Sequence, residues 1–167
     1  MKPLVFMFSH DNIFAGVKQE TSLLAERKFD EDNNSLFEEL VFDEEYLIKF
    51  RELFFDAQAE VTPALSAYMR DIPVEGGYFE EQDFSSDRDY IFNLLMPDDW
   101  NFHLVKPVDI KIRQFLIAYI VYRWLETKLP QEALIYQQRA KDVLQDAKVL
   151  LDKRTRPIRR EHWFYEG

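Results

Sequence analysis

The sequence predicts a mainly α-helical domain, a bundle-like arrangement of four to five helices with a small β-hairpin near residues 90–105. Residues 43–70, 107–129 and 131–153 repeat apolar side chains at the three- and four-residue steps of buried helices. Prolines stand near the ends of these stretches, where they start or interrupt a helix. Two shorter apolar runs flank a Pro-Asp-Asp turn, which favours the hairpin.

We expect residues 1–153 to form a single helical domain, with an excursion and the hairpin inside residues 71–106. Residues 154–167 then form a basic and aromatic C-terminal tail. At the start of the domain, Ser9 and Asp11 are candidate N-caps for a short helix over residues 10–18.

The first strong helix begins at Asp43, because an Asp N-cap followed by acidic residues complements the helix dipole. Its apolar residues continue past Pro63, which removes one backbone hydrogen bond and crowds the preceding turn. We therefore predict a kink or break near Val61 and Thr62, and a kinked pair of helices that ends at about Arg70.

The hairpin is expected to pair residues 90–96 with residues 102–105 across the turn at Pro97. A helical turn or irregular packing is also compatible with this segment.

Pro107 suits the first turn of the next helix, which is apolar on most sides and is expected to be central. That helix ends near Pro130, and the last helix runs from Gln131 to about Lys153. The short connection makes these two helices antiparallel neighbours.

Charge is divided along the chain. Residues 1–100 hold 23 of the 31 acidic and 8 of the 21 basic residues, a net charge of −15, whereas residues 101–167 carry +5. Opposite charges suit head-to-tail contact between copies, so this division predicts assembly. The acidic bulk argues against general binding to nucleic acid.

The chain has no cysteine, which excludes disulfides, thiolate zinc sites and cysteine nucleophiles and fits a reducing cytosol. Its longest apolar run, residues 115–122, is too short to cross a membrane. The first residues lack the length and cleavage site of a secretory signal. We expect a protein that is cytoplasmic before assembly, with no membrane partner.

No residue is predicted to be catalytic, to ligate a metal or to hold a cofactor. The three histidines, His10, His103 and His162, lack the spacing of a metal site. Adjacent acidic residues point in different directions on a helix, so solvated faces and helix caps explain them better than catalysis does.

The tail is the candidate partner-binding site. Its residues are of the types enriched at interface anchors: Arg154, Arg156, Arg159, Arg160, Trp163, Phe164 and Tyr165. A frayed terminus, or one folded back on its own acidic domain, is an equally weighted alternative. Contact between these arginines and phosphate groups is a further option.

Several segments in order resemble the small helical head-to-tail connector (head-completion) proteins of tailed phages, in the Mu-like branch. The resemblance spans residues 43–160 and lies in residues 56–61 and 67–69, in Pro107 with Ile110 and Lys111, and in residues 117–122, 136–140 and 143–144. Residues 89–98, 119–124 and 154–160 also resemble uncharacterised proteins of Bacteroidetes prophages. The segment between the helices is longer here, and the Arg-rich tail is not part of the Mu-like pattern.

The resemblance implies a ring-forming virion protein that docks to portal or tail proteins, has no active site and can be monomeric in isolation. Two alternatives stay open. One is an acidic monomeric adaptor or inhibitor that mimics nucleic acid, suggested by the acidic first hundred residues. The other is a helical enzyme, whose mark would be carboxylates clustered in a deep cleft.

Overall fold

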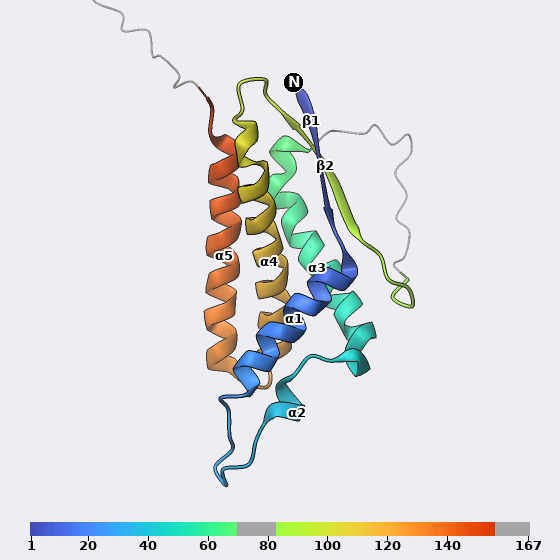
Figure 1. The fold of residues 1–167 in the computed structure, drawn as a ribbon, viewed down its shortest axis with the longest axis vertical. Coiled ribbons are helices and arrows are strands. Elements are labelled where there is room, and N and C mark those ends of the chain that lie inside the picture. Colours follow the sequence, from blue (N-terminus) through green and yellow to red (C-terminus); the bar gives the residue numbers. More distant parts are fainter. Residues whose placement is uncertain (70–82, 156–167) are drawn as a thin grey trace, which may run out of the picture.

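The computed structural model describes residues 1–69 and 83–155. This part of the chain has four long helices, a short helix and a two-stranded antiparallel sheet (Figure 1). The predicted mainly α, bundle-like fold with a small sheet is confirmed.

The two C-terminal helices form the longest antiparallel pair, as predicted. Helix α4 (Val105–Leu125) has Pro107 in its first turn, and α5 (Pro130–Asp152) begins on Pro130 itself. Helices α1, α3 and α5 all pack against α4, which explains why α4 is apolar on most sides (Figure 1). Helix α4 ends at Leu125, slightly earlier than the sequence suggested.

Helix α1 (His10–Ala25) begins where predicted, with the Ser9 hydroxyl accepting a hydrogen bond from the main chain of Asn12, but it continues beyond Lys18. The polar residue Thr21 interrupts the apolar pattern, so the sequence did not predict this continuation. Its hydroxyl donates to the Val17 carbonyl and accepts from the Phe42 main-chain N–H, both at 3.0 Å, so Thr21 is fully buried at little cost.

After the short helix α2 (Phe37–Leu40), Asp43 caps a 3₁₀ turn, Glu44–Tyr46, that leads into α3 (Leu47–Leu65). Of the predicted kink or break near Val61, the break is wrong, because α3 runs through Pro63 and a second 3₁₀ turn, Ser66–Tyr68, follows it. The kink stays a prediction. Pro63 lies close to the helix end, where it removes only one interior hydrogen bond.

The strand predicted at residues 90–96 is present as β2 (Tyr90–Met96), but its partner differs from the predicted one. It pairs with β1 (Lys2–Phe8), in a register that sets Phe6 opposite Phe92. Residues 102–104 instead form a 3₁₀ turn capped by the Asn101 side chain, and this turn runs into α4.

Aromatic packing explains why β1 is the partner strand. Both strands turn alternate residues inward, and the rings of Phe6 and Phe92 stack with centroids 5.4 Å apart. Phe8 also stacks on Tyr90 and on Phe92. The N-terminal run therefore buries its apolar face against the helices through a pairing that local sequence does not reveal.

Candidate functional site

Of the seven predicted tail residues, the described part of the chain includes only Arg154. It forms a β-bridge with Trp100, its Nη1 donates to the Leu151 carbonyl at 3.0 Å, and its Nε lies 3.5 Å from an Asp99 carboxylate oxygen. Next to it, the Thr155 main-chain N–H donates to the Asp99 carbonyl at 2.8 Å. Arg154 thus contacts its own domain.

The other six predicted residues, Arg156, Arg159, Arg160, Trp163, Phe164 and Tyr165, lie outside the described residues. Their role in partner binding stays a prediction.

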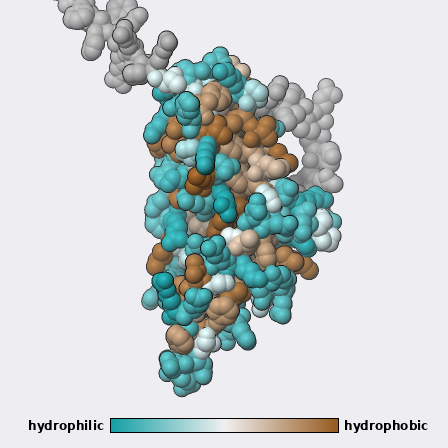
Figure 2. Space-filling model, in the orientation of Figure 1, coloured by the Kyte–Doolittle hydropathy of each residue, from teal (hydrophilic) through white to brown (hydrophobic). Residues whose placement is uncertain are grey.

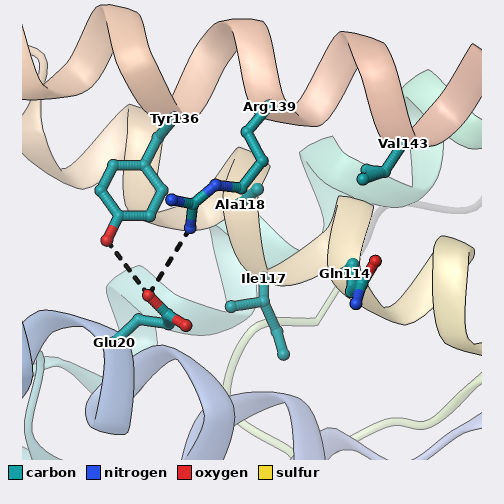
Figure 3. A pocket seen from close by; sticks show the side chains of 7 residues that line it. All are labelled: Glu20, Gln114, Ile117, Ala118, Tyr136, Arg139 and Val143. Carbon is teal, nitrogen blue, oxygen red and sulfur yellow. Dashed lines mark hydrogen bonds and ion pairs between the residues drawn. The ribbon is translucent and has the colours of Figure 1, made fainter.

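A pocket of about 310 Å³ lies between α1, α4 and α5, close to Glu20, Tyr136 and Arg139 (Figure 3). The Tyr136 hydroxyl donates to Glu20 Oε2 at 3.1 Å, and Arg139 Nη1 lies 3.8 Å from the same oxygen. Burial of the phenol and the neighbouring Glu20 carboxylate raise the pKa of Tyr136 to about 12. The Glu20 carboxylate of α1 is therefore already paired with Tyr136 and Arg139 of α5, and this cluster holds α1 against α5.

A second pocket, of about 320 Å³, is lined by residues of α3, α4 and α5 and by Glu126. Arg123 donates from Nε to Glu126 at 3.1 Å and from Nη1 to the Tyr119 hydroxyl at 3.0 Å. The Tyr122 hydroxyl also donates to Glu126, and this hydrogen bond raises the pKa of Tyr122. Arg123 and Glu126 of this pocket are therefore paired with each other and with tyrosine hydroxyls.

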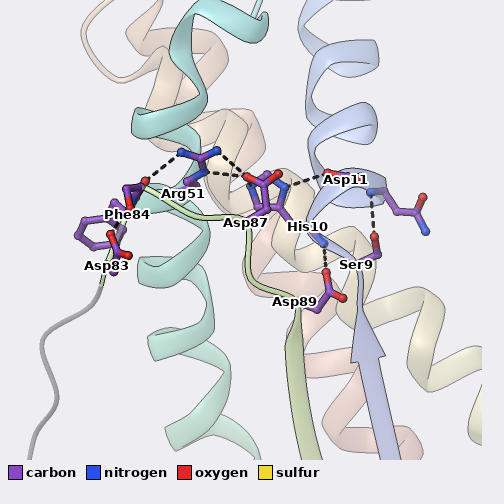
Figure 4. A network of polar contacts seen from close by, with 10 residues as sticks. Ser9, His10, Asp11, Arg51, Asp83, Phe84, Asp87 and Asp89 are labelled. Carbon is purple, nitrogen blue, oxygen red and sulfur yellow. Dashed lines mark hydrogen bonds and ion pairs between the residues drawn. The ribbon is translucent and has the colours of Figure 1, made fainter.

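A polar network joins the start of α1 to α3 and to residues 83–89 (Figure 4). The His10 main-chain N–H donates to Asp89 at 2.8 Å. Arg51 of α3 donates to Asp87 Oδ1 through Nε at 2.9 Å and Nη2 at 2.6 Å, and to the Phe84 carbonyl through Nη1 at 3.0 Å. Arg51 therefore ties the incoming segment to the helices.

His10 is the buried member of this network. Its ring is 97% buried, lies edge-on to Phe50 with centroids 4.9 Å apart, and sets Nδ1 3.1 Å from Asp11 Oδ1. On the other side, Nε2 lies 3.4 Å from Asp87 Oδ1. Each ring nitrogen therefore has a carboxylate oxygen nearby, and Nε2 makes no hydrogen bond to the described residues.

His10, Asp11 and Asp87 are also the described residues whose ligand atoms come within 4.8 Å of one another, a spacing that suits a metal ion. Two features of the geometry disfavour that use. The carboxylates face different ring nitrogens, and the Asp87 oxygen nearest the ring is already held by Arg51. The arrangement is better suited to holding the chain together than to coordinating a cation.

The outer face of the β1–β2 sheet is unusually apolar. Val5, Met7 and Ile91 are 61%, 62% and 57% exposed, and the register sets Met7 directly opposite Ile91. In the orientation of Figure 1, hydrophobic residues gather over the part of the molecule where the strands lie (Figure 2). Antiparallel sheets usually turn polar residues to water, so this face is a candidate binding surface.

Sequence reasoning missed this surface. The apolar run at the start of the chain is visible in the sequence, but its length excludes only a secretory signal and does not indicate a strand. The available signal was the alternation around Phe6 and Phe8, whose buried rings leave Val5 and Met7 on the opposite face.

No described helix is both long enough and apolar enough to span a lipid bilayer. Comparison with protein-family models, curated proteins and solved structures gave no match. The fold and surface define the class: a small, mainly α-helical protein with a two-stranded sheet whose outer face is apolar.

Proposed function

We propose that this protein is a structural assembly component that acts by binding other protein surfaces. The observation that carries the proposal is the exposed apolar face formed by Val5, Met7 and Ile91. Exposed apolar side chains clustered on a regular element mark protein contact sites, because burying them against a partner removes them from water.

Two further features support an assembly role. The carboxylates of Glu20 and Glu126, which border the two helical pockets, are each engaged by an arginine and a tyrosine. These groups stabilise contacts between and within helices. The division between an acidic first hundred residues and a basic remainder favours attraction between copies or towards a charged partner.

The narrower proposal is a phage or prophage head-to-tail connector subunit, which forms a ring and docks to portal or tail proteins. Its support is the sequence resemblance over residues 43–160, together with the charge division. Portal, capsid and tail genes beside this gene would strengthen it. Purification with the portal or tail proteins encoded nearby would test it directly, and failure of every pair to associate would count against it.

A charge-reversal experiment on the full chain tests the part assigned to the tail. Replacing Arg156, Arg159 and Arg160 by Glu should reduce assembly measured by sedimentation velocity at low salt. The matched control makes the same charge change at exposed positions of the helical domain: Arg27→Glu, Arg113→Glu and Lys141→Glu. Equal effects of the two variants would assign the loss to net charge alone and would remove the tail from the proposal.

The acidic adaptor or inhibitor is kept as a second candidate because the first hundred residues carry a net charge of −15. A strictly monomeric protein that competes with DNA for a basic enzyme would favour it over the assembly role.

A further inference from the structure

The outer face of the sheet is apolar over almost its whole length. It consists of alternate residues from both strands: Pro3, Val5 and Met7 of β1, and Ile91, Asn93 and Leu95 of β2. Asn93 is the one polar residue among these six. The inner face is buried against the helices, so the sheet has apolar side chains on both sides.

The two edges of the sheet differ. Beside β2, Met69 forms a β-bridge with Leu94 and covers part of that edge. Along β1, β2 is the one pairing strand found among residues 1–69 and 83–155. Within the described part of the chain, β1 is therefore an edge strand whose outward backbone donors and acceptors suit pairing with a further strand.

Pro3 indicates which backbone groups lie on this open edge. Proline has no N–H, and it is tolerated in a strand where that N–H would point away from the pairing strand. Because backbone groups alternate along a strand, those of Pro3, Val5 and Met7 face the open edge.

We propose that the occupant of this edge is a second copy of the chain, whose β1 pairs antiparallel with the first across a two-fold axis near Val5. Each sheet then becomes half of a four-stranded sheet with the order β2-β1-β1-β2. This inference rests on the proposed assembly role, and it names the contact between copies.

The sequence of β1 is self-complementary in this register. Val5 meets Val5 of the second copy, and Pro3 lies opposite Met7, so apolar residues meet apolar residues on the outer face. The Met7 N–H can donate to the carbonyl of the opposing Pro3, so the missing proline N–H removes only part of the ladder.

Charge favours the antiparallel direction. Lys2 lies at one end of β1, and the strongly exposed carboxylate of Asp11 lies just beyond the other end. Antiparallel pairing brings Lys2 of each copy towards Asp11 of the other, whereas parallel pairing would set like charges side by side.

A two-fold contact of this kind closes on itself and yields dimers. Growth of dimers into a larger ring needs a second, different contact, and the oppositely charged parts of the chain are suited to supply it.

The first test measures self-association of the full chain by sedimentation velocity over a range of concentrations. Val5→Lys should weaken the dimer about tenfold or more, since lysine blunts edge pairing and the two lysines would lie directly opposite each other as like charges. The controls Ile48→Lys and Leu134→Lys change residues of similar exposure on α3 and α5, at 68% and 63%, and should leave association unchanged.

Since the chain has no cysteine, disulfide trapping can test the register. Val5→Cys should form a disulfide-linked dimer on mild oxidation, because antiparallel partners lie within disulfide reach. Met7→Cys alone should cross-link poorly, because Met7 of one copy lies opposite Pro3 of the other. A mixture of Pro3→Cys and Met7→Cys proteins should therefore cross-link efficiently. Ile48→Cys serves as the control for random collisions.

A wild-type protein that stays monomeric over the whole range would overturn the proposal. So would equal effects of Val5→Lys and Ile48→Lys, or cross-linking without preference for Val5. If association survives Val5→Lys but is lost on tail charge reversal, the strand contact is wrong and the assembly role stands. If neither change affects an existing assembly, both assigned contacts are wrong.

Discussion

The indole Nε1 of Trp124 donates a 2.8 Å hydrogen bond to the main-chain carbonyl oxygen of Leu40, 84 residues earlier in the chain. The indole also packs on Phe42, with ring centroids 4.4 Å apart, and Lys128 Nζ lies over the indole, 4.0 Å from the ring centroid. One side chain of α4 thus holds the short helix α2 and the chain after it against the bundle.

Trp124→Phe should lower the free energy of unfolding by about 2–3 kcal/mol, since it leaves the buried Leu40 carbonyl unpaired and opens a small cavity. Chemical denaturation would measure the loss. Phe37→Leu, at a partly exposed position on the same short helix, should change stability by less than about 0.5 kcal/mol. A Trp124→Phe variant as stable as that control would show that the hydrogen bond contributes little.

At Gly16, helix α1 packs close to α4. A Cβ placed on Gly16 would lie 2.5 Å from Ile117 Cδ1, so Gly16→Ala should cost about 1–2 kcal/mol of stability. Ile117→Val removes the Cδ1 methyl group. In that background Gly16→Ala should become neutral or should stabilise the protein by up to about 1 kcal/mol, because alanine has a higher helix propensity than glycine. Thermal unfolding of the four proteins tests this, and additive effects would contradict it.

Tyr136 makes stability depend on pH in the alkaline range. Its pKa is raised to about 12 in the folded state, whereas an unfolded tyrosine ionises near 10. The stabilisation is therefore complete below about pH 10 and is lost as pH rises towards 12, because unfolding then releases a proton.

Tyr136→Phe removes that proton. Between about pH 10 and 12 the wild type should lose about 1–3 kcal/mol more stability than the variant. Urea unfolding at several pH values measures the difference. A gap between the two proteins that stays constant with pH would show that Tyr136 titrates normally.

Asp87→Asn should loosen residues 83–89 from the helices. It weakens the charge-assisted hydrogen bonds from Arg51, which is largely buried. We expect the free energy of local opening of this segment to fall by about 1–2 kcal/mol. Hydrogen exchange should speed up in residues 83–89 and at His10, whose N–H is bonded to Asp89. Asp142→Asn, on the exposed face of α5, is the matched control and should leave exchange in this region unchanged.

The long helices were predictable because their evidence is local. Apolar residues at helical spacing, the Asp43 cap and the prolines at 107 and 130 lie within the segments they organise. Thr21 shows the limit of such reasoning, because its burial depends on a hydrogen bond from Phe42, which is distant in sequence.

The amino-acid sequence by itself determined that this chain is mainly helical, where α4 and α5 lie, and how charge is divided between its two parts. Only the tertiary structure decided that β2 pairs with β1, which places Val5 and Met7 beside Ile91 on one exposed face. Helix formation follows from residues three and four apart, whereas strand pairing joins segments more than eighty residues apart. The choice of partner strand is therefore made by packing of the whole core, and no local pattern records it.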